Sequence, residues 1–303
     1  MFTLALLSMI LAEPCSMPAA LEQRVCADPG LRKLDGELAA KERAVAAESA
    51  RPATWAATAV RFRAILAAET DGDGKPIGRD ELESRLRDQI GTLDLELAAA
   101  RGIRAPHDEA EALGAACLAG WYDHGCEVPA SGILRDDGVR ILWQLQSGAS
   151  DANGGGMGVM LWDASAPGAP RLIGWTFEGA WMQAPRYDPQ NHLFWVPGRR
   201  AGTGEGNADL LYQKQGDRWV EIELVSWRDD LDKRLPRGLG AWHGVDYDFS
   251  GMGADTDLWK DSDANCCATG GRATIGFRIE GSSAKLDSLQ VQTGGPAGDW
   301  KDY

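Results

Sequence analysis

The spacing of apolar residues changes once along the chain, and the change separates a helical part from a strand-rich part. Between residues 29 and 100, apolar side chains recur every three or four residues, which is typical of amphipathic helices. The three apolar stripes consist of Leu31, Leu34 and Leu38; of Trp55, Val60, Phe62, Ile65 and Leu66; and of Leu82, Leu86, Ile90, Leu93 and Leu97. We therefore predict a small antiparallel helical bundle, with Asp28 as its first cap and Pro29 in its first turn.

From residue 139 onward, apolar and polar residues alternate, which is typical of half-buried strands. In the segment 139–146, Gln144 and Gln146 occupy the face opposite Leu145. Between clusters of Gly, Asp, Asn and Pro, similar runs recur at 156–163, 171–179, 192–198, 209–215, 218–225, 245–249, 273–281 and 286–292. One helix is expected at 226–236. No exact repeat of 20 to 50 residues is present, so the pattern does not favour a propeller. The predicted fold class is α+β with two domains: an N-terminal helical bundle followed by an antiparallel all-β sandwich or barrel-like domain.

The first residues of the chain predict export. The run FTLALLSMILA at residues 2–12 has the length of a signal-peptide core and is shorter than the roughly 20 residues that span a membrane. We therefore expect a periplasmic or secreted protein without a membrane span in its mature form. The predicted layout is a signal peptide at 1–12, a helical domain at 13–104, a linker at 105–130, an all-β domain at 131–292 and a flexible tail at 293–303.

Charge narrows the class of partner. The chain has 45 acidic and 31 basic residues, a net charge of −14, and most of the excess lies after residue 104. Nucleic-acid binding needs clustered Lys and Arg, which the sequence lacks. A basic protein partner or a cation fits this composition better. Eleven of the 12 tryptophans follow residue 120, which supplies amphipathic surface for a core or for a binding face.

The six cysteines form three close couples, and an even number in an exported chain indicates a disulfide framework. Local pairing within the first two couples is the simplest arrangement. The adjacent couple could bond to itself, or its members could reach the second couple. The couples are Cys15 and Cys26, Cys117 and Cys126, and Cys266 and Cys267.

The segment ALEQRVCADPGLRKLDGELAA at residues 20–40 resembles the opening of the LprI-type lysozyme inhibitor domain. The resemblance covers about a quarter of the chain, and QIGTL at 89–93 is similar to the closing helix of that domain. It implies an exported small helical module and suggests lysozyme as a kind of partner, without assigning an inhibitory residue. The matching positions are Glu22, Cys26, Leu31, Leu34, Asp35 and Leu38, with Cys15 as the upstream cysteine.

Two loops have oxygen-bearing side chains at spacings near those of calcium loops, but both depart from the standard loop, so we expect no cofactor and keep calcium as the one alternative. The first loop lies at residues 69–82, where Pro76 disturbs the twelve-residue register, so a hydrophilic turn explains the same residues. In the second, DSDANCC, cysteines replace the required glycine, so we expect an Asx-rich turn that positions the cysteines. The candidate ligands are Glu69, Asp71, Asp73 and Glu81 in the first loop, and Asp261, Asp263 and Asn265 in the second.

The motifs do not define a reaction, and no catalytic residue is assigned. Trp175, Glu178 and Trp181 combine aromatic rings with a carboxylate and are the predicted binding residues. The first hypothesis is a non-enzymatic exported binding protein of the cell envelope, similar to lysozyme inhibitors, that binds a basic protein. The alternatives are a cell-envelope glycan hydrolase acting through the β domain and a purely structural surface module.

Overall fold

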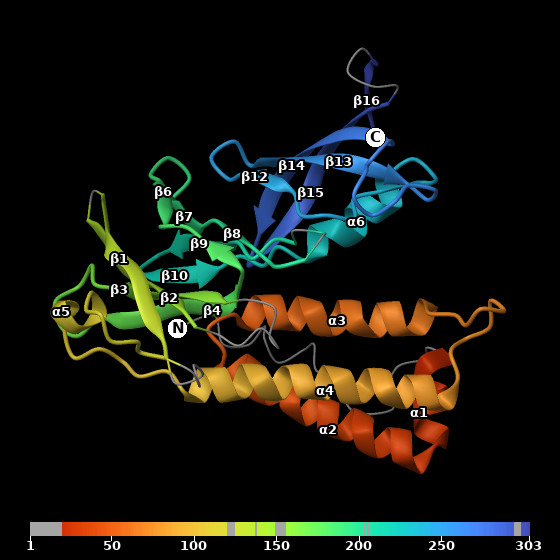
Figure 1. Ribbon diagram of the computed structural model, residues 1–303, viewed down its shortest axis with the longest axis horizontal. Helices are drawn as coiled ribbons and strands as arrows, with labels where there is room; N and C mark the ends of the chain where they lie inside the picture. The colour runs from red at the N-terminus through yellow and green to blue at the C-terminus, as the bar shows by residue number, and fades with distance from the viewer. Residues whose placement is uncertain are drawn as a thin grey trace. The chain divides into compact units, whose positions relative to one another are not determined.

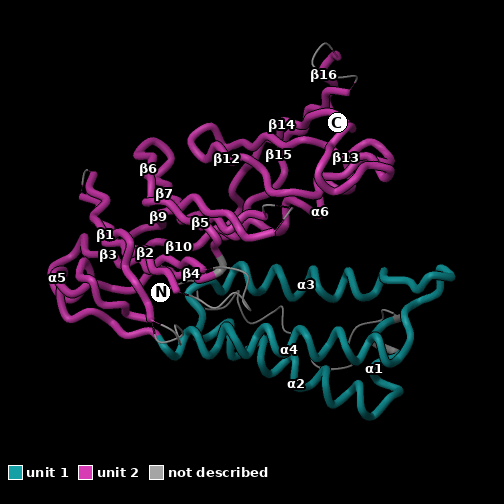
Figure 2. Tube along the Cα trace, viewed as in Figure 1, with its two compact units in different colours: residues 1–102 teal, residues 103–303 magenta. Residues whose placement is uncertain are grey.

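The computed structural model describes residues 20–119, 125–136, 138–148, 156–202, 204, 206–293 and 298–303. The predicted signal peptide at 1–12 and Cys15 lie outside these residues. The chain divides into two compact units, Met1–Gly102 and Ile103–Tyr303, which we call the helical unit and the β unit (Figure 2). Helices near the N-terminus are followed by mostly antiparallel sheets, as predicted for an α+β chain (Figure 1).

The helical unit is built from the predicted apolar stripes. Its helices are α1 (Ala20–Ala27), α2 (Pro29–Glu48), α3 (Pro52–Ala68) and α4 (Arg79–Arg101). Asp28 caps α2, since its carboxylate accepts hydrogen bonds from the amides of Gly30 at 2.8 Å and Leu31 at 3.0 Å. The stripes of α2 and α4 are buried in one core.

The predicted stripe of α3 is partly wrong. Leu66 is buried and Trp55 and Phe62 pack at the edge of the core, but Val60 and Ile65 are 55% and 54% exposed. Successive residues of an α-helix are rotated by about 100° around its axis, so residues 55, 59, 62 and 66 lie on one face. Val60 and Ile65 lie well to either side of that face, which explains their exposure.

The β unit begins with the short helix α5 (Glu109–Ala112) and a four-stranded antiparallel sheet. This sheet follows chain order and consists of β1 (Glu127–Asp136), β2 (Val139–Ser147), β3 (Met157–Asp163) and β4 (Arg171–Gly179). Strand β1 begins inside the segment predicted as a linker. The linker therefore contributes to the fold of the β unit.

Strand β2 is buried on both faces, so the prediction of a half-buried strand is wrong. Leu145 packs in the core on one face, and Gln144 and Gln146 are fully buried on the other. The Gln144 amide donates to the carbonyls of Gly114 at 3.0 Å and Ala116 at 3.1 Å. The segment before the sheet thus covers this face and accepts both hydrogen bonds of the Gln144 amide.

The second sheet also follows chain order and shares a core with the first. It consists of β6 (Arg186–Asp188), β7 (Leu193–Val196), β9 (Leu210–Gln215) and β10 (Arg218–Glu221), and a small separate sheet pairs β5 (Trp181–Met182) with β8 (Gly198–Arg199). Phe194 and Tyr212 stack at 4.7 Å in the core between the two sheets, where they join Leu145 and Leu161. This contact makes the two sheets adjacent layers.

The third sheet packs on the opposite face of the second sheet, together with helix α6 (Ser226–Arg234). Its strands are β11 (Leu239–Gly240), β12 (Asp246–Asp248), β13 (Gly253–Lys260), β14 (Gly271–Glu280), β15 (Ser283–Gln292) and β16 (Trp300–Asp302). Leu193 and Leu211 of the second sheet join Trp227 of α6 and Ile275 of β14 in one core. The second sheet is therefore a central layer with both faces covered.

One hairpin of the second sheet and one hairpin of the third sheet close through the same type of turn. The hairpins β6–β7 and β12–β13 both close through four residues, with Asp188 paired to Leu193 and Asp248 to Gly253. In each loop the aspartate accepts a backbone hydrogen bond, and the last loop residue has a positive φ, 52° at His192 and 51° at Met252. The sequence did not predict this correspondence, because the two hairpins have few residues in common.

Two segments of the third sheet were not predicted as strands. Strand β13 was missed because its outward residues are aspartates and its inward residues include Ala254 and Thr256. Strand β16 lies in the predicted flexible tail, but Trp300–Asp302 pairs with Gln290–Gln292 of β15. The tail prediction is therefore wrong for these three residues.

Candidate functional site

The outer face of the third sheet is the most distinctive surface of the β unit. Along β13, Ala254 and Leu258 are buried, whereas Asp255 and Asp257 are exposed. The alternation follows from the period of two in a strand, which directs neighbouring side chains to opposite faces. Every outward position in the centre of this strand thus carries an acid.

The register of the sheet extends this surface across five strands. Residues directly opposite in antiparallel strands have side chains on the same face. One row therefore crosses the sheet through Asp246, Asp255, Thr274, Gln290 and Asp302. A second row crosses it through Asp257, Arg272, Gln292 and Trp300.

Hydrogen bonds order the side chains within these rows. The Thr274 hydroxyl donates to Asp255 at 2.6 Å, and the Gln290 amide donates to Asp302 at 2.9 Å. Each carboxylate keeps further acceptor capacity, because an ionised carboxylate offers about four lone-pair sites. The aspartates are thus fixed in place while remaining able to accept hydrogen bonds from a ligand.

Two arginines contact the aspartates of this face. The Arg272 guanidinium lies 3.7 Å from Asp257, and both side chains are more than 60% exposed. Arg199 forms an ion pair with Asp246, whose side chain is still 86% exposed. Exposed pairs of this kind are weak and screened by salt, so the arginines offset only part of the negative potential.

We call Asp246, Asp255, Asp257 and Asp302 the acidic face. The segment 244–270, which supplies three of them, contains six aspartates and a single lysine, for a net charge of −5. Asp246 and Asp255 are directly paired, and like charges in this position repel each other. A cationic partner would relieve this repulsion.

A network of hydrogen bonds anchors the start of β12 beneath the acidic face. Asn207 accepts from the Val245 amide at 2.8 Å and donates to its carbonyl at 2.9 Å. Arg199 donates to the same carbonyl at 2.8 Å, and Arg228 donates to the Asn207 side chain at 3.0 Å. The edge strand that carries Asp246 is therefore rigidly placed.

Two titratable groups of this network have shifted pKa values. Burial raises the pKa of Asp209 above its usual range, although its hydrogen bond from Asn207 at 2.8 Å opposes the shift. Burial likewise raises the pKa of Tyr247, whose hydroxyl accepts from the Trp227 indole at 3.1 Å. Asp209 contributes more to the internal polar network than to the exposed acidic surface.

Exposed aromatic side chains occur on the same unit. Trp300 is the last residue of the second row, which begins at Asp257, and it is 43% exposed. Trp242 is 43% exposed and stacks on Trp259 with ring centroids 6.2 Å apart. Because tryptophan combines a large apolar ring with a hydrogen-bond donor, such residues are common anchors in binding surfaces.

The three residues predicted to bind a ligand lie in different environments. Trp175 is 2% exposed and stacks on Phe177, so it belongs to the interior of the unit. Trp181 is 48% exposed and pairs with Arg199 across the two-stranded sheet. The side chain of Glu178 lies outside the described residues. Trp181 alone among them adds exposed aromatic surface in the part of the chain that the structure describes.

The loop after β13 folds around Asp263. Its carboxylate accepts hydrogen bonds from the amides of Lys260 and Thr269, both at 2.8 Å, and from the Thr269 hydroxyl at 2.7 Å. These contacts, led by the Lys260 amide, hold the pKa of Asp263 below its usual range. Asp261 and Asn265 are exposed in the same loop. This geometry is that of an Asx-rich turn.

The carboxylates of the loop at residues 69–82 also have partners within the helical unit. Glu69 and Glu81 form ion pairs with Arg85, at 2.6 Å and 3.1 Å. Asp71 accepts from the amides of Asp73 and Lys75, both at 2.9 Å. The same residues that suggested a calcium loop therefore close a hydrophilic turn.

Within the described residues, no group of three His, Cys, Asp or Glu side chains is placed to hold a metal ion. Calcium binding at the two loops stays a prediction. The residues that would hold calcium are those of the two turns, and binding would compete with the hydrogen bonds that Asp71 and Asp263 already accept.

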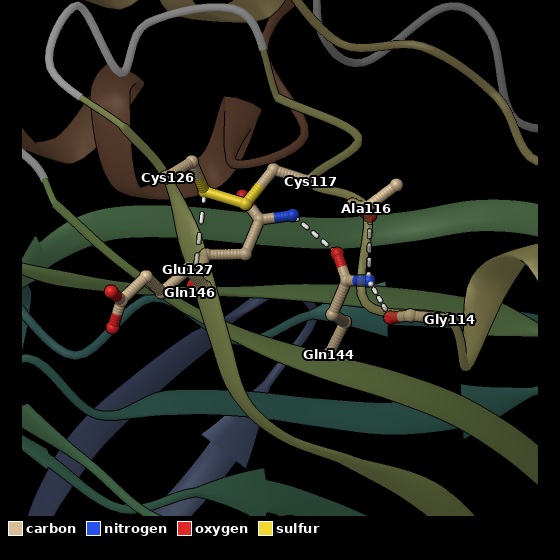
Figure 3. Close-up of a disulfide and its surroundings, with 7 residues drawn as sticks. All are labelled: Gly114, Ala116, Cys117, Cys126, Glu127, Gln144 and Gln146. Atoms are coloured by element: carbon tan, nitrogen blue, oxygen red, sulfur yellow. Dashed lines mark hydrogen bonds between the residues drawn. A yellow bond between two sulfur atoms is a disulfide. The ribbon is translucent and has the colours of Figure 1, made fainter.

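Two of the predicted cysteine couples form disulfides. Cys117 bonds to Cys126 with 6.1 Å between Cα atoms, and this bond lies beside Gln144 and Gln146 (Figure 3). Cys266 bonds to Cys267. Cys26 is also disulfide-bonded, and its predicted partner lies outside the described residues.

No protein-family model and no curated protein matches this chain. Among the described helices, none is long and apolar enough to cross a membrane.

Proposed function

We propose that the chain is an exported, non-enzymatic binding protein of the cell envelope, and that its acidic face binds a basic protein. The observation that carries this proposal is the ordered pair of rows on the outer face of the third sheet, with Asp255 in the first row and Asp257 in the second. Complementary charge would steer a cationic partner toward this face, and Trp300 would supply an apolar contact at its edge.

Lysozyme is the basic partner that we propose to test first, because residues 20–40 resemble the LprI-type inhibitor domain. The proposed layout joins a helical module of that type to a disulfide-containing, sandwich-like β domain. Leu31, Leu34 and Leu38 of the resembling segment are buried in the helical core, so their role is to form the module. The four aspartates of the acidic face, which we propose as the contact surface, are on the β unit.

The test is the rate at which lysozyme degrades cell walls, with and without the purified full chain, at low and at high ionic strength. We expect inhibition at low ionic strength that weakens steeply as salt is added, because salt screens exposed charges. Inhibition that is equally strong at both ionic strengths would contradict binding through the acidic face. Equal lysozyme rates with and without the chain would remove lysozyme as the partner.

The same assay without lysozyme separates this proposal from the hydrolase alternative. A glycan hydrolase would degrade the walls by itself, whereas a binding protein would leave them intact. Release of soluble glycan by the chain alone would therefore contradict the non-enzymatic proposal.

A further inference from the structure

We propose that Cys266 and Cys267 form a thiol–disulfide exchange site, with a thiol-containing reductant as its substrate. The proposal is independent of the acidic face, because it concerns the chemistry of the loop between β13 and β14. It assigns this disulfide a reactive role instead of the structural one that an even cysteine count suggests.

The first argument is that this disulfide cannot cross-link distant parts of the fold. Disulfides stabilise a protein mainly by restricting the unfolded chain, and the effect grows with the length of the loop that they close. Cys266 and Cys267 are already joined by a peptide bond, and their Cα atoms are 3.8 Å apart, as in any consecutive trans pair. Their disulfide therefore restricts almost nothing beyond the loop itself. The disulfide between Cys117 and Cys126, by contrast, joins residues nine positions apart and therefore restricts the unfolded chain.

The second argument is accessibility. Both Cys266 and Cys267 are exposed on the loop. Exchange begins when a thiolate attacks a disulfide sulfur, so it requires an open approach to that sulfur. An exposed disulfide between adjacent residues meets this requirement from solvent without any opening of the core.

The third argument is that the loop keeps its backbone without the disulfide. The Asp263 carboxylate binds the Lys260 amide on one side and Thr269 on the other, which fixes the two ends of the loop. The Cys267 amide donates to the Ala264 carbonyl at 2.9 Å within it. Because these bonds involve no sulfur, reduction would leave the hairpin folded, and reoxidation would begin with both thiols close together.

The reaction balances in two steps. A donor thiolate attacks one sulfur of the pair, so a mixed disulfide forms and the other cysteine leaves as a thiolate. A second donor thiolate then attacks the donor sulfur of the mixed disulfide and releases the second cysteine. Two electrons and two protons pass to Cys266 and Cys267, which become thiols, and the two donor thiols become one disulfide.

The experiment measures the reduction rate of each disulfide in the full chain. The chain is treated with dithiothreitol or with reduced glutathione, quenched by alkylation, and digested for mass spectrometry. We expect the Cys266–Cys267 disulfide to be reduced at least about tenfold faster than the Cys117–Cys126 disulfide by both reagents, and to re-form with oxidised glutathione.

Two serine variants separate a reactive role from a structural one. The thermal midpoint of C266S/C267S should stay within about 1 °C of the native chain, whereas that of C117S/C126S should fall by several degrees. The proposal is overturned if the adjacent disulfide is reduced no faster than Cys117–Cys126. It is equally overturned if C266S/C267S unfolds as early as the other variant or does not fold.

Discussion

Asp209 shows how a single buried carboxyl can make stability depend on pH. Its folded pKa is raised by burial above the ordinary value of 3.8. Between these two values the folded chain retains a proton that the unfolded chain has released. Stability therefore falls as pH rises through this window, and it stays reduced above the folded pKa.

The variant Asp209→Asn removes this titration and keeps an acceptor oxygen for Asn207. We expect the thermal midpoint of the variant, relative to the native chain, to rise by a few degrees between pH 3.5 and pH 7. Parallel thermal melts monitored by circular dichroism across this range measure the difference. A difference that stays constant with pH would show that Asp209 does not titrate in this window.

Gly174 is a residue whose identity is fixed by a close approach between two sheets. A Cβ at this position would lie 1.8 Å from the hydroxyl oxygen of Tyr212, which is fully buried and stacked on Phe194. The ring cannot swing away without disturbing that stack. Gly174→Ala should therefore destabilise the β unit by about 1–3 kcal/mol.

The matched control for this prediction is Gly91→Ala in helix α4. Gly91 is exposed, and a Cβ there would meet no atom within 4 Å. Alanine in an exposed helix interior should stabilise by up to about 1 kcal/mol. Chemical denaturation of both variants gives the comparison, and a stabilising Gly174→Ala would contradict the observed packing of the two sheets.

At the scale of elements, the first turn of α2 depends on Asp28. The amides of Leu31 and Gly30 and the guanidinium of Arg79 hold the pKa of Asp28 below 3.8, the Leu31 amide being the largest cause. A carboxyl with a lowered folded pKa contributes stability that is fully present above the unfolded pKa and is lost as pH falls through the folded pKa.

Asp28→Ala should therefore lower the thermal midpoint of the helical unit by several degrees at pH 7 and by less at pH 2. Helical circular dichroism at the two pH values reports this change directly. Asp80→Ala is a suitable comparison, since its side chain is 98% exposed. Equal losses for Asp28→Ala at both pH values would argue against capping by the ionised carboxylate.

The elements differ in how well the sequence predicted them, and the reason is physical. The apolar stripes of α2 and α4 were predicted because each helix buries one face against the other. The burial of Gln144 and Gln146 was not predicted, because the segment that covers them reaches this face only in the tertiary fold. Strand β13 was missed because its outward face carries Asp255 and Asp257, residue types that are depleted in strands.

The candidate site was the least predictable feature for the same reason. The net negative charge after residue 104 indicated a basic partner, but sequence could not show that Asp246, Asp255 and Asp302 share one row. That row depends on the register of four separate strand pairings. The predicted pair Trp175 and Trp181 shared only sequence proximity, and one ring is buried while the other is exposed.

At the scale of the whole molecule, the two units differ in chemistry. The helical unit has acidic and basic residues in nearly equal number and many intrahelical and interhelical ion pairs, such as Arg79–Glu83 and Arg101–Glu48. The β unit carries most of the excess negative charge and eleven of the tryptophans. This division assigns partner binding to the β unit in our account.

The most direct test of that account is the affinity of the full chain for lysozyme, as a basic protein, at low ionic strength. The native chain is compared with D255N/D257N, which neutralises two of the four aspartates of the acidic face, and with D136N/D217N, which removes the same charge from exposed positions of the first and second sheets. We expect D255N/D257N to bind at least about fivefold more weakly and with a shallower salt dependence, and D136N/D217N to bind within about twofold of the native chain. Equal affinities for the two variants would contradict recognition through the acidic face.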